Sequence, residues 1–237
     1  QAGLDVIQLP HPPLVEVVAS AALSISVVVP SYNHGAFIDQ RLASILSQRR
    51  APCEIIIIDD ASHDDSLLRA RTFAETAPMP VRIITREQNS GSPFTSWEEG
   101  ARLACGDLLW IAESDDVADP RLLERLAPFL EQDEQVKLAY CQSSVIGHHG
   151  ERLADDHLFY TDEIDAKRWE VPYVLPGETE IAKALAIKNT IPNVSAVLFR
   201  RHDLAEVAHT IVADRYCGDW RCYALLAARG WIGYSPE

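Results

Sequence analysis

Residues 54–65 read Glu-Ile-Ile-Ile-Ile-Asp-Asp-Ala-Ser-His-Asp-Asp, so four consecutive isoleucines run directly into an acidic loop. A short segment that is apolar on both faces is typical of a strand in the middle of a sheet, with helices covering both sides. We therefore predict a central strand over Glu54–Ile58. Its carboxyl end opens on four aspartates, all of which lie within Asp59–Asp65.

Strand and helix patterns alternate on both sides of this run. Ile25–Val29 is a predicted strand that Pro30 stops, and apolar residues at helical spacing predict a helix over Ala36–Gln48. The alternation indicates βαβ units, and hence an α/β fold with a mainly parallel central sheet flanked by helices. Further helices are predicted at Ser66–Ala77, Phe94–Ala104 and Pro120–Gln132 (with Pro120 at the first helical position), and further strands at Val81–Ile84, Leu108–Ala112 and Lys137–Cys141.

The alternation breaks down over residues 143–176, which are rich in His, Asp and Gly. We expect a hairpin there, followed by a long loop. The acidic stretch Asp155–Val171 is irregular enough to serve as a mobile lid. Regular patterns return afterwards, with helices predicted at Glu178–Ile187, Asp203–Val212 and Trp220–Arg229, and strands at Ser195–Phe199 and Trp231–Tyr234.

The composition excludes several classes of function. Among 237 residues, 21 Lys plus Arg and 35 Asp plus Glu give a formal net charge of −14. That surplus disfavours sequence-independent binding of nucleic acid or anionic lipid, and it fits a partner that is a cation or arrives with one. No apolar run approaches the roughly 20 residues that a membrane-spanning helix needs. Five widely spaced cysteines match neither a disulfide framework nor a zinc knuckle, so we expect reduced cysteines packed as small hydrophobic residues in a cytoplasmic protein.

Acidic side chains follow two of the predicted strands at the point where each strand ends. Asp59 and Asp60 follow the isoleucine strand, whereas Glu113, Asp115 and Asp116 follow the strand that begins at residue 108. Ligands of parallel sheets bind outside the carboxyl ends of the strands. Adjacent oxygen ligands suit magnesium or manganese bound together with substrate phosphates, although aspartate is also common in turns and helix caps.

The loop after the first strand separates the classes of nucleotide-binding enzyme. It reads Pro30-Ser-Tyr-Asn-His-Gly35, which lacks the G-x-G-x-x-G of dinucleotide-binding oxidoreductases. It also lacks the glycine- and Lys/Arg-rich loop that a nucleotidyltransferase would need. No G-x-x-x-x-G-K-S/T of a P-loop enzyme occurs anywhere in the chain. We therefore expect a metal, rather than a glycine-rich loop, to hold phosphate.

Four segments, in this order, resemble the successive motifs of family 2 glycosyltransferases. They read ISVVVPSYN at 25–33, IIIIDDASHD at 55–64, NSG at 89–91 and GDLLWIAESDD at 106–116. The resemblance resumes over 193–201 and 218–237. It implies a GT-A type fold, similar to nucleotide-diphospho-sugar transferases, that binds a nucleotide-sugar beside a divalent metal, Mn²⁺ or Mg²⁺.

The resemblance also implies a domain organisation. Residues 25–237 would form one catalytic domain, with a nucleotide-sugar half at about 25–142 and an acceptor half at about 143–237. Residues 1–24 contain three prolines and no Lys or Arg, and are predicted to be a linker or N-terminal extension. The chain starts without Met, and relatives continue past the Tyr-x-Pro-Glu motif, so we expect a part of a longer protein. The Q-x-x-R-W of processive membrane synthases is absent.

The resemblance assigns the nucleotide to the loops after the first two strands. Pro30, Tyr32 and Asn33 would form the floor beneath the nucleotide, with Tyr32 near the base. Asp59 and Asp60 match the acidic pair whose carboxylate contacts the base in the family.

The segment Glu113-Ser-Asp115 matches the D-x-D motif of the family. Asp115 is the expected metal ligand, and Asp116 would help with the metal or the sugar. Glu113 stands where the family has Asp, and the longer side chain would lie near the ribose or a metal-bound water.

Asp219 matches the catalytic base of the family. The usual pair there is Glu-Asp, but Gly218 occupies the first position, so only the second acid remains. Asp219 would also serve as the N-cap of the helix predicted at Trp220–Arg229, and the two roles can coexist. Trp220 is the candidate for stacking on a sugar of the acceptor.

These assignments predict a metal-dependent, inverting transfer of a sugar from a nucleotide-sugar, a UDP-sugar, to the hydroxyl of a glycan or lipid-linked acceptor. Asp219 would act as general base, and the process would be polysaccharide assembly in the cytoplasm or at the inner face of its membrane. The alternative is a degenerate, non-catalytic module that only binds nucleotide-sugar. Glu113 and Gly218, the two departures from the family pattern, keep that alternative open.

Overall fold

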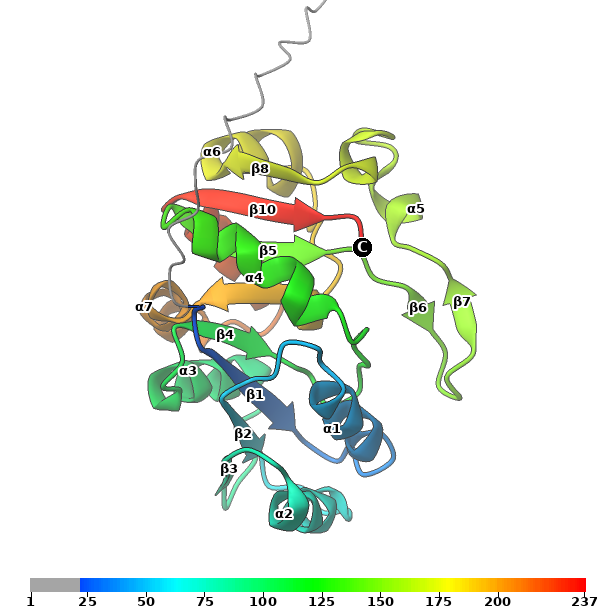
Figure 1. Cartoon of the computed structure of the whole chain (residues 1–237), viewed down its shortest axis with the longest axis vertical. Coiled ribbons are helices and arrows are strands. Elements are labelled where there is room, and N and C mark those ends of the chain that lie inside the picture. The colour runs from blue at the N-terminus through cyan, green and yellow to red at the C-terminus, as the bar shows by residue number, and fades with distance from the viewer. Residues whose placement is uncertain (1–21) are drawn as a thin grey trace, which may run out of the picture.

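The computed structural model describes residues 22–237. Residues 1–21, which make up most of the linker predicted over residues 1–24, lie outside this range. One mixed sheet runs through the molecule in the order β3-β2-β1-β4-β9-β5-β10-β8 (Figure 1). Its strands are β1 (Ile25–Ser31), β2 (Glu54–Asp59), β3 (Val81–Thr85), β4 (Leu108–Ile111), β5 (Val136–Cys141), β8 (Tyr173–Pro176), β9 (Val197–Arg200) and β10 (Trp231–Ser235).

Helices cover both faces of the sheet. The core on one face includes residues of α1, α2 and α4, and the core on the other face includes residues of α3, α7 and α8. The helices are α1 (Ile38–Leu46), α2 (Ser66–Thr76), α3 (Pro93–Leu103), α4 (Leu122–Gln132), α5 (Leu158–Thr161), α6 (Gly177–Glu180), α7 (Arg201–Ile211) and α8 (Gly218–Ala227). Helix α4 begins after Pro120, so the prediction of proline at its first position is wrong.

Strand β2 has the central position that its isoleucine run predicts. It lies between β1 and β3 and is parallel to both. Ile55 and Ile57 belong to the core on the α1 face, whereas Ile56 and Ile58 belong to the core on the α3 face, and all four are fully buried. The alternation of a strand thus places two isoleucines in each core.

The sheet is parallel across β3, β2, β1 and β4, and mixed beyond them. Strand β9 is antiparallel to both of its neighbours, β4 and β5, and β8 is antiparallel to β10. The chain therefore enters β9 at the edge where β1, β2 and β4 end. A 3₁₀ turn over Val194–Ala196 stands at that entry, and it brings Ser195 to the edge where the predicted ligand-binding loops lie.

The sequence predicted that Pro30 stops the first strand. This prediction is wrong, because β1 continues to Ser31. The register explains why the proline is tolerated. Strand β4 pairs with β1 only up to Val28, opposite Ile111, so the missing N–H of Pro30 faces a side where no ladder bond is required.

The segment 143–176 contains the expected hairpin, formed by β6 (Val145–Ile146) and β7 (Arg152–Ala154). Its tip reaches α1, where the rings of His148 and Phe37 meet edge to face at 5.3 Å between centroids. The stretch predicted as a mobile lid is anchored to the core by the buried Trp169. The indole N–H of Trp169 donates to the Tyr140 hydroxyl at 2.8 Å.

The cysteines follow the sequence prediction only in part. All five are free, and Cys141 and Cys222 are buried, with burial raising the pKa of each thiol to about 12. Cys53, Cys105 and Cys217 are exposed, so the prediction of packed cysteines is wrong for these three.

None of the helices within 22–237 combines the length and apolar character that crossing a bilayer demands.

Among residues 22–237, three residues other than glycine adopt a positive φ, and each lies in a loop next to the candidate site: Asn33 at 55°, Ala61 at 64° and Cys217 at 57°. We expect Ala61→Gly to raise the free energy of unfolding by about 1 kcal/mol, because glycine adopts this conformation without strain. Chemical denaturation measures the change. The control Ala43→Gly, at an exposed site inside α1, should lower it by about 1 kcal/mol. Equal destabilisation by both substitutions would contradict the prediction.

Candidate active site

Hydrogen bonds join three loops at the carboxyl ends of β1, β2 and β4. The backbone N–H of Asn33 donates to Ser62 Oγ at 3.0 Å, and the N–H of His63 donates to Asn33 Oδ1 at 2.7 Å. His34 Nδ1 is hydrogen-bonded to Ser114 Oγ at 2.6 Å. The loops that the sequence singled out separately thus form one surface.

The residues predicted beneath the nucleotide lie on this surface or directly below it. Pro30 is buried within β1, whereas the Tyr32 side chain is 41% exposed at the end of that strand. Asn33 carries the hydrogen bonds that join its loop to the β2 loop. An exposed aromatic ring next to a polar loop is available to stack on a base.

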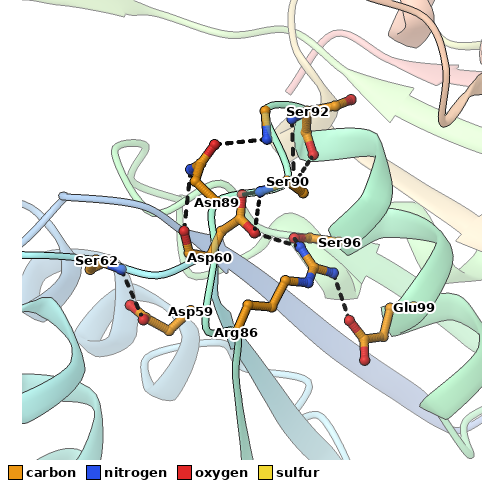
Figure 2. A network of polar contacts seen from close by, with 10 residues as sticks. Asp59, Asp60, Ser62, Arg86, Asn89, Ser90, Ser92, Ser96 and Glu99 are labelled. Carbon is orange, nitrogen blue, oxygen red and sulfur yellow. Dashed lines mark hydrogen bonds and ion pairs between the residues drawn. The ribbon is translucent and has the colours of Figure 1, made fainter.

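Asp60 is the centre of a polar network (Figure 2). Arg86 Nη1 lies 2.8 Å from its carboxylate, and Ser90 donates to the same carboxylate from both its backbone N–H and its hydroxyl. Arg86 also pairs with Glu99 at 2.6 Å, and Asn89 donates to the Asp60 carbonyl at 3.2 Å. The Asp60 carboxylate is therefore fixed in place and neutralised.

Asp59 differs from Asp60 because one of its carboxylate oxygens accepts no hydrogen bond from the described part of the chain. Its Oδ2 accepts a hydrogen bond from the Ser62 N–H at 3.1 Å, and Figure 2 shows this contact on the far side of the strand end from the Asp60 network. Its Oδ1 is buried and has no partner in the described part of the chain. A buried carboxylate oxygen without a donor is costly unless a ligand supplies one.

Glu113, the first acid of the D-x-D-like segment, is turned toward helix α3. Trp97 donates its indole N–H to Glu113 Oε1 at 2.8 Å. Burial, with the charges of Asp115 and Asp116 adding to its effect, raises the pKa of Glu113 to about 7. One carboxylate oxygen is therefore committed to the protein, and the predicted contact of Glu113 with ribose or metal-bound water stays a prediction.

Arg41, a fully buried arginine, lies beneath the acidic segment and is not among the site residues predicted from the sequence. Its Nε donates to the Glu113 carbonyl at 2.7 Å, its Nη2 donates to Ser195 Oγ at 3.0 Å, and Nη2 lies 3.8 Å from Asp116 Oδ2. The guanidinium also lies over the Trp110 ring, 5.5 Å from its centroid. Desolvation lowers its pKa to about 10, so Arg41 keeps its charge at neutral pH and partly neutralises Asp116.

Asp115 is the exposed carboxylate of this segment, and no cationic side chain pairs with it among residues 22–237. No group of three or more His, Cys, Asp or Glu side chains within that range forms a ready-made metal cage. Magnesium and manganese bound with substrate phosphates need only one or two protein carboxylates. The donor set present, Asp115 with Asp116 beside it, fits a metal of that kind.

Asp219 lies in the first turn of α8 and accepts a hydrogen bond at Oδ2 from Asn189 Nδ2 at 2.9 Å. The N-cap position of α8 belongs to Cys217, and no side chain there caps the helix, so the prediction that Asp219 is the N-cap is wrong. Its carboxylate is therefore not consumed by a capping bond. Negative charge in the first turn of a helix is favourable because of the helix dipole.

Phe94 crowds Gly218, the position where the family has the first acid of its pair. A Cβ added at Gly218 would lie 2.6 Å from Phe94 Cζ, so a side chain there would require the Phe94 ring to shift. Phe94 packs edge to face on Trp97 at 5.0 Å between centroids, and Trp97 holds Glu113. The two departures from the family pattern, Glu113 and Gly218, are thus connected through the packed side chains of Trp97 and Phe94.

Trp220 follows Asp219, but its indole N–H donates to the Leu185 carbonyl at 2.8 Å, and its half-buried ring packs against the core. Its stacking on an acceptor sugar stays a prediction. A cavity of about 680 Å³ opens next to the acidic segment, beside Asp116. Polar side chains that line it include Asp116, Gln142 and Asn193.

The sequence model of "Glycosyl transferase family 2" matches residues 26–204. The match covers most of the chain, and the chain belongs to this family, as its four motifs predicted. Among curated relatives, a glycosyltransferase of Haemophilus influenzae (strain ATCC 51907 / DSM 11121 / KW20 / Rd) is 23% identical over 90% of this chain and 63% of its own length.

Another relative, the poly(ribitol-phosphate) beta-N-acetylglucosaminyltransferase TarP of Staphylococcus aureus (strain N315), is 24% identical over 73% of this chain and 47% of its own length. The chain thus spans less than two thirds of the length of these relatives.

Solved structures confirm the predicted GT-A type α/β fold. S. aureus TarS 1-349 in complex with UDP superposes with a TM-score of 0.68 at 18% identity, covering 91% of this chain and 58% of TarS 1-349. The mannosyltransferase PcManGT from Pyrobaculum calidifontis, in complex with GDP-Man and Mn²⁺, superposes with a TM-score of 0.60 at 19% identity, covering 91% of this chain and 55% of the other. At these identities the likeness shows the fold alone.

Proposed function

We propose that this domain transfers a sugar from a nucleotide-sugar to an acceptor hydroxyl in a metal-dependent, inverting reaction. The observation that carries the proposal is the distribution of positive charge at the edge of the sheet. One arginine each accompanies Asp60 and Asp116, whereas Asp115 and Asp219 have no cationic partner in the described part of the chain. Two uncompensated carboxylates, one on the loop after β4 and one in the first turn of α8, suit one cation site and one proton acceptor.

The donor we propose is a UDP-sugar. TarS has been crystallised with UDP and with UDP-GlcNAc, and the mannosyltransferase with GDP-Man and Mn²⁺. Three features of this chain support a nucleotide in the equivalent place: the exposed ring of Tyr32, the Asn33 loop and the unpartnered Oδ1 of Asp59. Asp60, which Arg86 and Ser90 hold rigidly, would form part of the same base-binding wall.

Asp115 and Asp116 would hold the divalent metal, which when bound neutralises the charge that develops on the leaving nucleoside diphosphate. Asp219 would accept the proton of the acceptor hydroxyl as that oxygen attacks the anomeric carbon. A single base, with no enzyme nucleophile, gives one displacement and therefore inversion at the anomeric carbon. Glu113, with one oxygen held by Trp97, would lie near the ribose or a metal-bound water.

We propose a glycan or lipid-linked acceptor, and a role in polysaccharide assembly, from membership of the family and from the polar cavity next to Asp116. The compartment we propose is the cytoplasm, where thiols such as the five free cysteines stay reduced. The competing function, a module that binds nucleotide-sugar without turning it over, draws its support from Gly218, which lacks the first acid of the usual pair and is crowded by Phe94.

Release of nucleoside diphosphate from a panel of nucleotide-sugars tests the proposal and separates it from the alternative. We expect one sugar nucleotide to be hydrolysed slowly in the presence of Mn²⁺, with hydrolysis lost on chelation, because water replaces the absent acceptor. Thermal unfolding should show stabilisation that needs both the nucleotide-sugar and the metal. Stabilisation without any hydrolysis or transfer would favour the binding module, and neither effect with any donor would refute both.

A further inference from the structure

The amide of Asn189 contacts the proposed base from a separate segment of the chain. Asn189 precedes β9, whereas Asp219 lies 30 residues later on α8, and Asn189 Nδ2 donates to Asp219 Oδ2 at 2.9 Å. No other hydrogen bond holds the Asp219 carboxylate among residues 22–237, so its Oδ1 stays free. One oxygen is thus fixed and the other is available.

Three buried polar atoms near this contact have no hydrogen-bond partner in the part of the chain that the structure describes. They are Asn189 Oδ1, Thr190 Oγ1 and the hydroxyl oxygen of Tyr223. Tyr223 lies one turn after Asp219 on the same helix. Polar atoms buried without partners are rare in cores and gather where geometry serves function rather than stability. The fold thus keeps Asn189 in place without satisfying its own amide oxygen.

An amide donor at this distance fixes the direction in which the free oxygen of the Asp219 carboxylate points. A second carboxylate in the same position would instead compete for a proton. Among residues 22–237, Asn189 is the side chain that hydrogen-bonds to the Asp219 carboxylate.

We propose that Asn189 is the positioning residue for the general base: it binds Asp219 Oδ2 and thereby leaves Oδ1 directed at the acceptor hydroxyl. This inference rests on the proposed role of Asp219 in transfer. Asn189 itself touches neither donor nor acceptor. Its removal should therefore affect the turnover number and its pH dependence, and leave donor binding unchanged.

The isosteric change Asn189→Asp tests the contact directly. It places two carboxylates 2.9 Å apart, and such a pair retains one proton to higher pH than a single acid does. Transfer needs an unprotonated base, so its rate falls as pH drops, and in the variant this fall should begin about one to three pH units higher. Asn189→Ala, which loses the contact without adding charge, should lower kcat roughly 10- to 100-fold with the donor KM unchanged.

Other titrating groups near Asp219 are the same in every variant. Cys222 and Tyr223 on α8 have pKa values raised by burial, and both stay neutral through the assay range. The charge of Glu113, whose own pKa burial raises to about 7, also acts on Tyr223. Because Glu113 contributes equally to the wild type and its variants, the difference between their profiles reports the Asn189 substitution.

Gln135→Glu is the matched control. It makes the same amide-to-carboxylate change at an exposed position before β5, at the opposite end of the strands, and it should leave the profile unchanged. Titration of the Asp219 carboxyl carbon by NMR provides a second readout that does not need turnover. A pH profile and an NMR titration of Asn189→Asp that both superpose on the wild type would overturn the proposal. A wild type inactive with every donor would overturn the proposed function, while the NMR titration would still report the contact.

Discussion

Replacing Asp219 with asparagine should reduce sugar transfer by about 100- to 10,000-fold, the range that a positioned general base contributes. Asparagine keeps the shape of the side chain but cannot take the proton of the acceptor. It can still present its amide oxygen to Asn189 Nδ2, so we expect the fold and the start of α8 to be retained. Release of nucleoside diphosphate in the presence of acceptor measures the rate, and calorimetry measures donor affinity, which should not change.

The control for this substitution is Asp214→Asn, in the loop before the same helix. Asp214 pairs with Arg221 on α8 at 2.9 Å, and both side chains are partly exposed. Loss of such a pair should cost within about 1 kcal/mol of stability and leave transfer intact. If Asp219→Asn turned over like the wild type while binding donor normally, Asp219 would not be the base.

The nucleotide-binding half of the fold could be predicted because its signals are local. A run such as Ile55–Ile58, apolar on both faces, defines a central strand without knowledge of its neighbours. The same holds for the acids that follow β2 and β4, since the ends of parallel strands meet at one edge of the sheet. Both predictions depend on residue types within a few positions of one another.

The second half of the sheet depends on contacts that no local pattern encodes. Strand β9 has an apolar sequence that fits either direction, and the path of the chain through Val194–Ala196 makes it antiparallel. Strand β8 is a short edge strand that pairs with β10 alone, and its residues are only half-buried or exposed. Such a strand lacks the alternation that predicts one.

In the candidate site too, some residues follow from local sequence signals and others depend on contacts between distant parts of the sequence. The acids were predicted, but their partners were not, because Arg41 binds the Glu113 carbonyl across 72 positions and Asn189 binds Asp219 across 30. One local signal did exist: Arg41 lies on the apolar face of its helix, beside Ile38, Leu42 and Ile45. A charge on a buried helical face requires a partner, and that partner indicates where the polar site lies.

Asp115→Ala should abolish manganese-dependent binding of the nucleotide-sugar. Asp115 is the exposed acid of its segment and has no ion-pair partner within residues 22–237, whereas Arg41 accompanies Asp116 and Trp97 holds Glu113. Loss of a group that only supports a metal ligand already costs about 10- to 100-fold in metal affinity. Loss of the ligand itself should therefore exceed about 100-fold. Calorimetric titrations of UDP into the domain, with Mn²⁺ and with a chelator, measure the effect.

The two titrations together distinguish metal ligation from a general effect of charge. Without metal, a carboxylate repels a diphosphate, so Asp115→Ala should bind UDP as well as the wild type or slightly better. With Mn²⁺, the wild type should gain affinity and the variant should not. Asp119→Asn removes a charge from the same loop, at an exposed side chain already paired with Arg121, and should retain the full response to Mn²⁺. Equal gains in the wild type and Asp115→Ala would place the metal elsewhere, because a ligand cannot be removed from a divalent ion without loss of affinity.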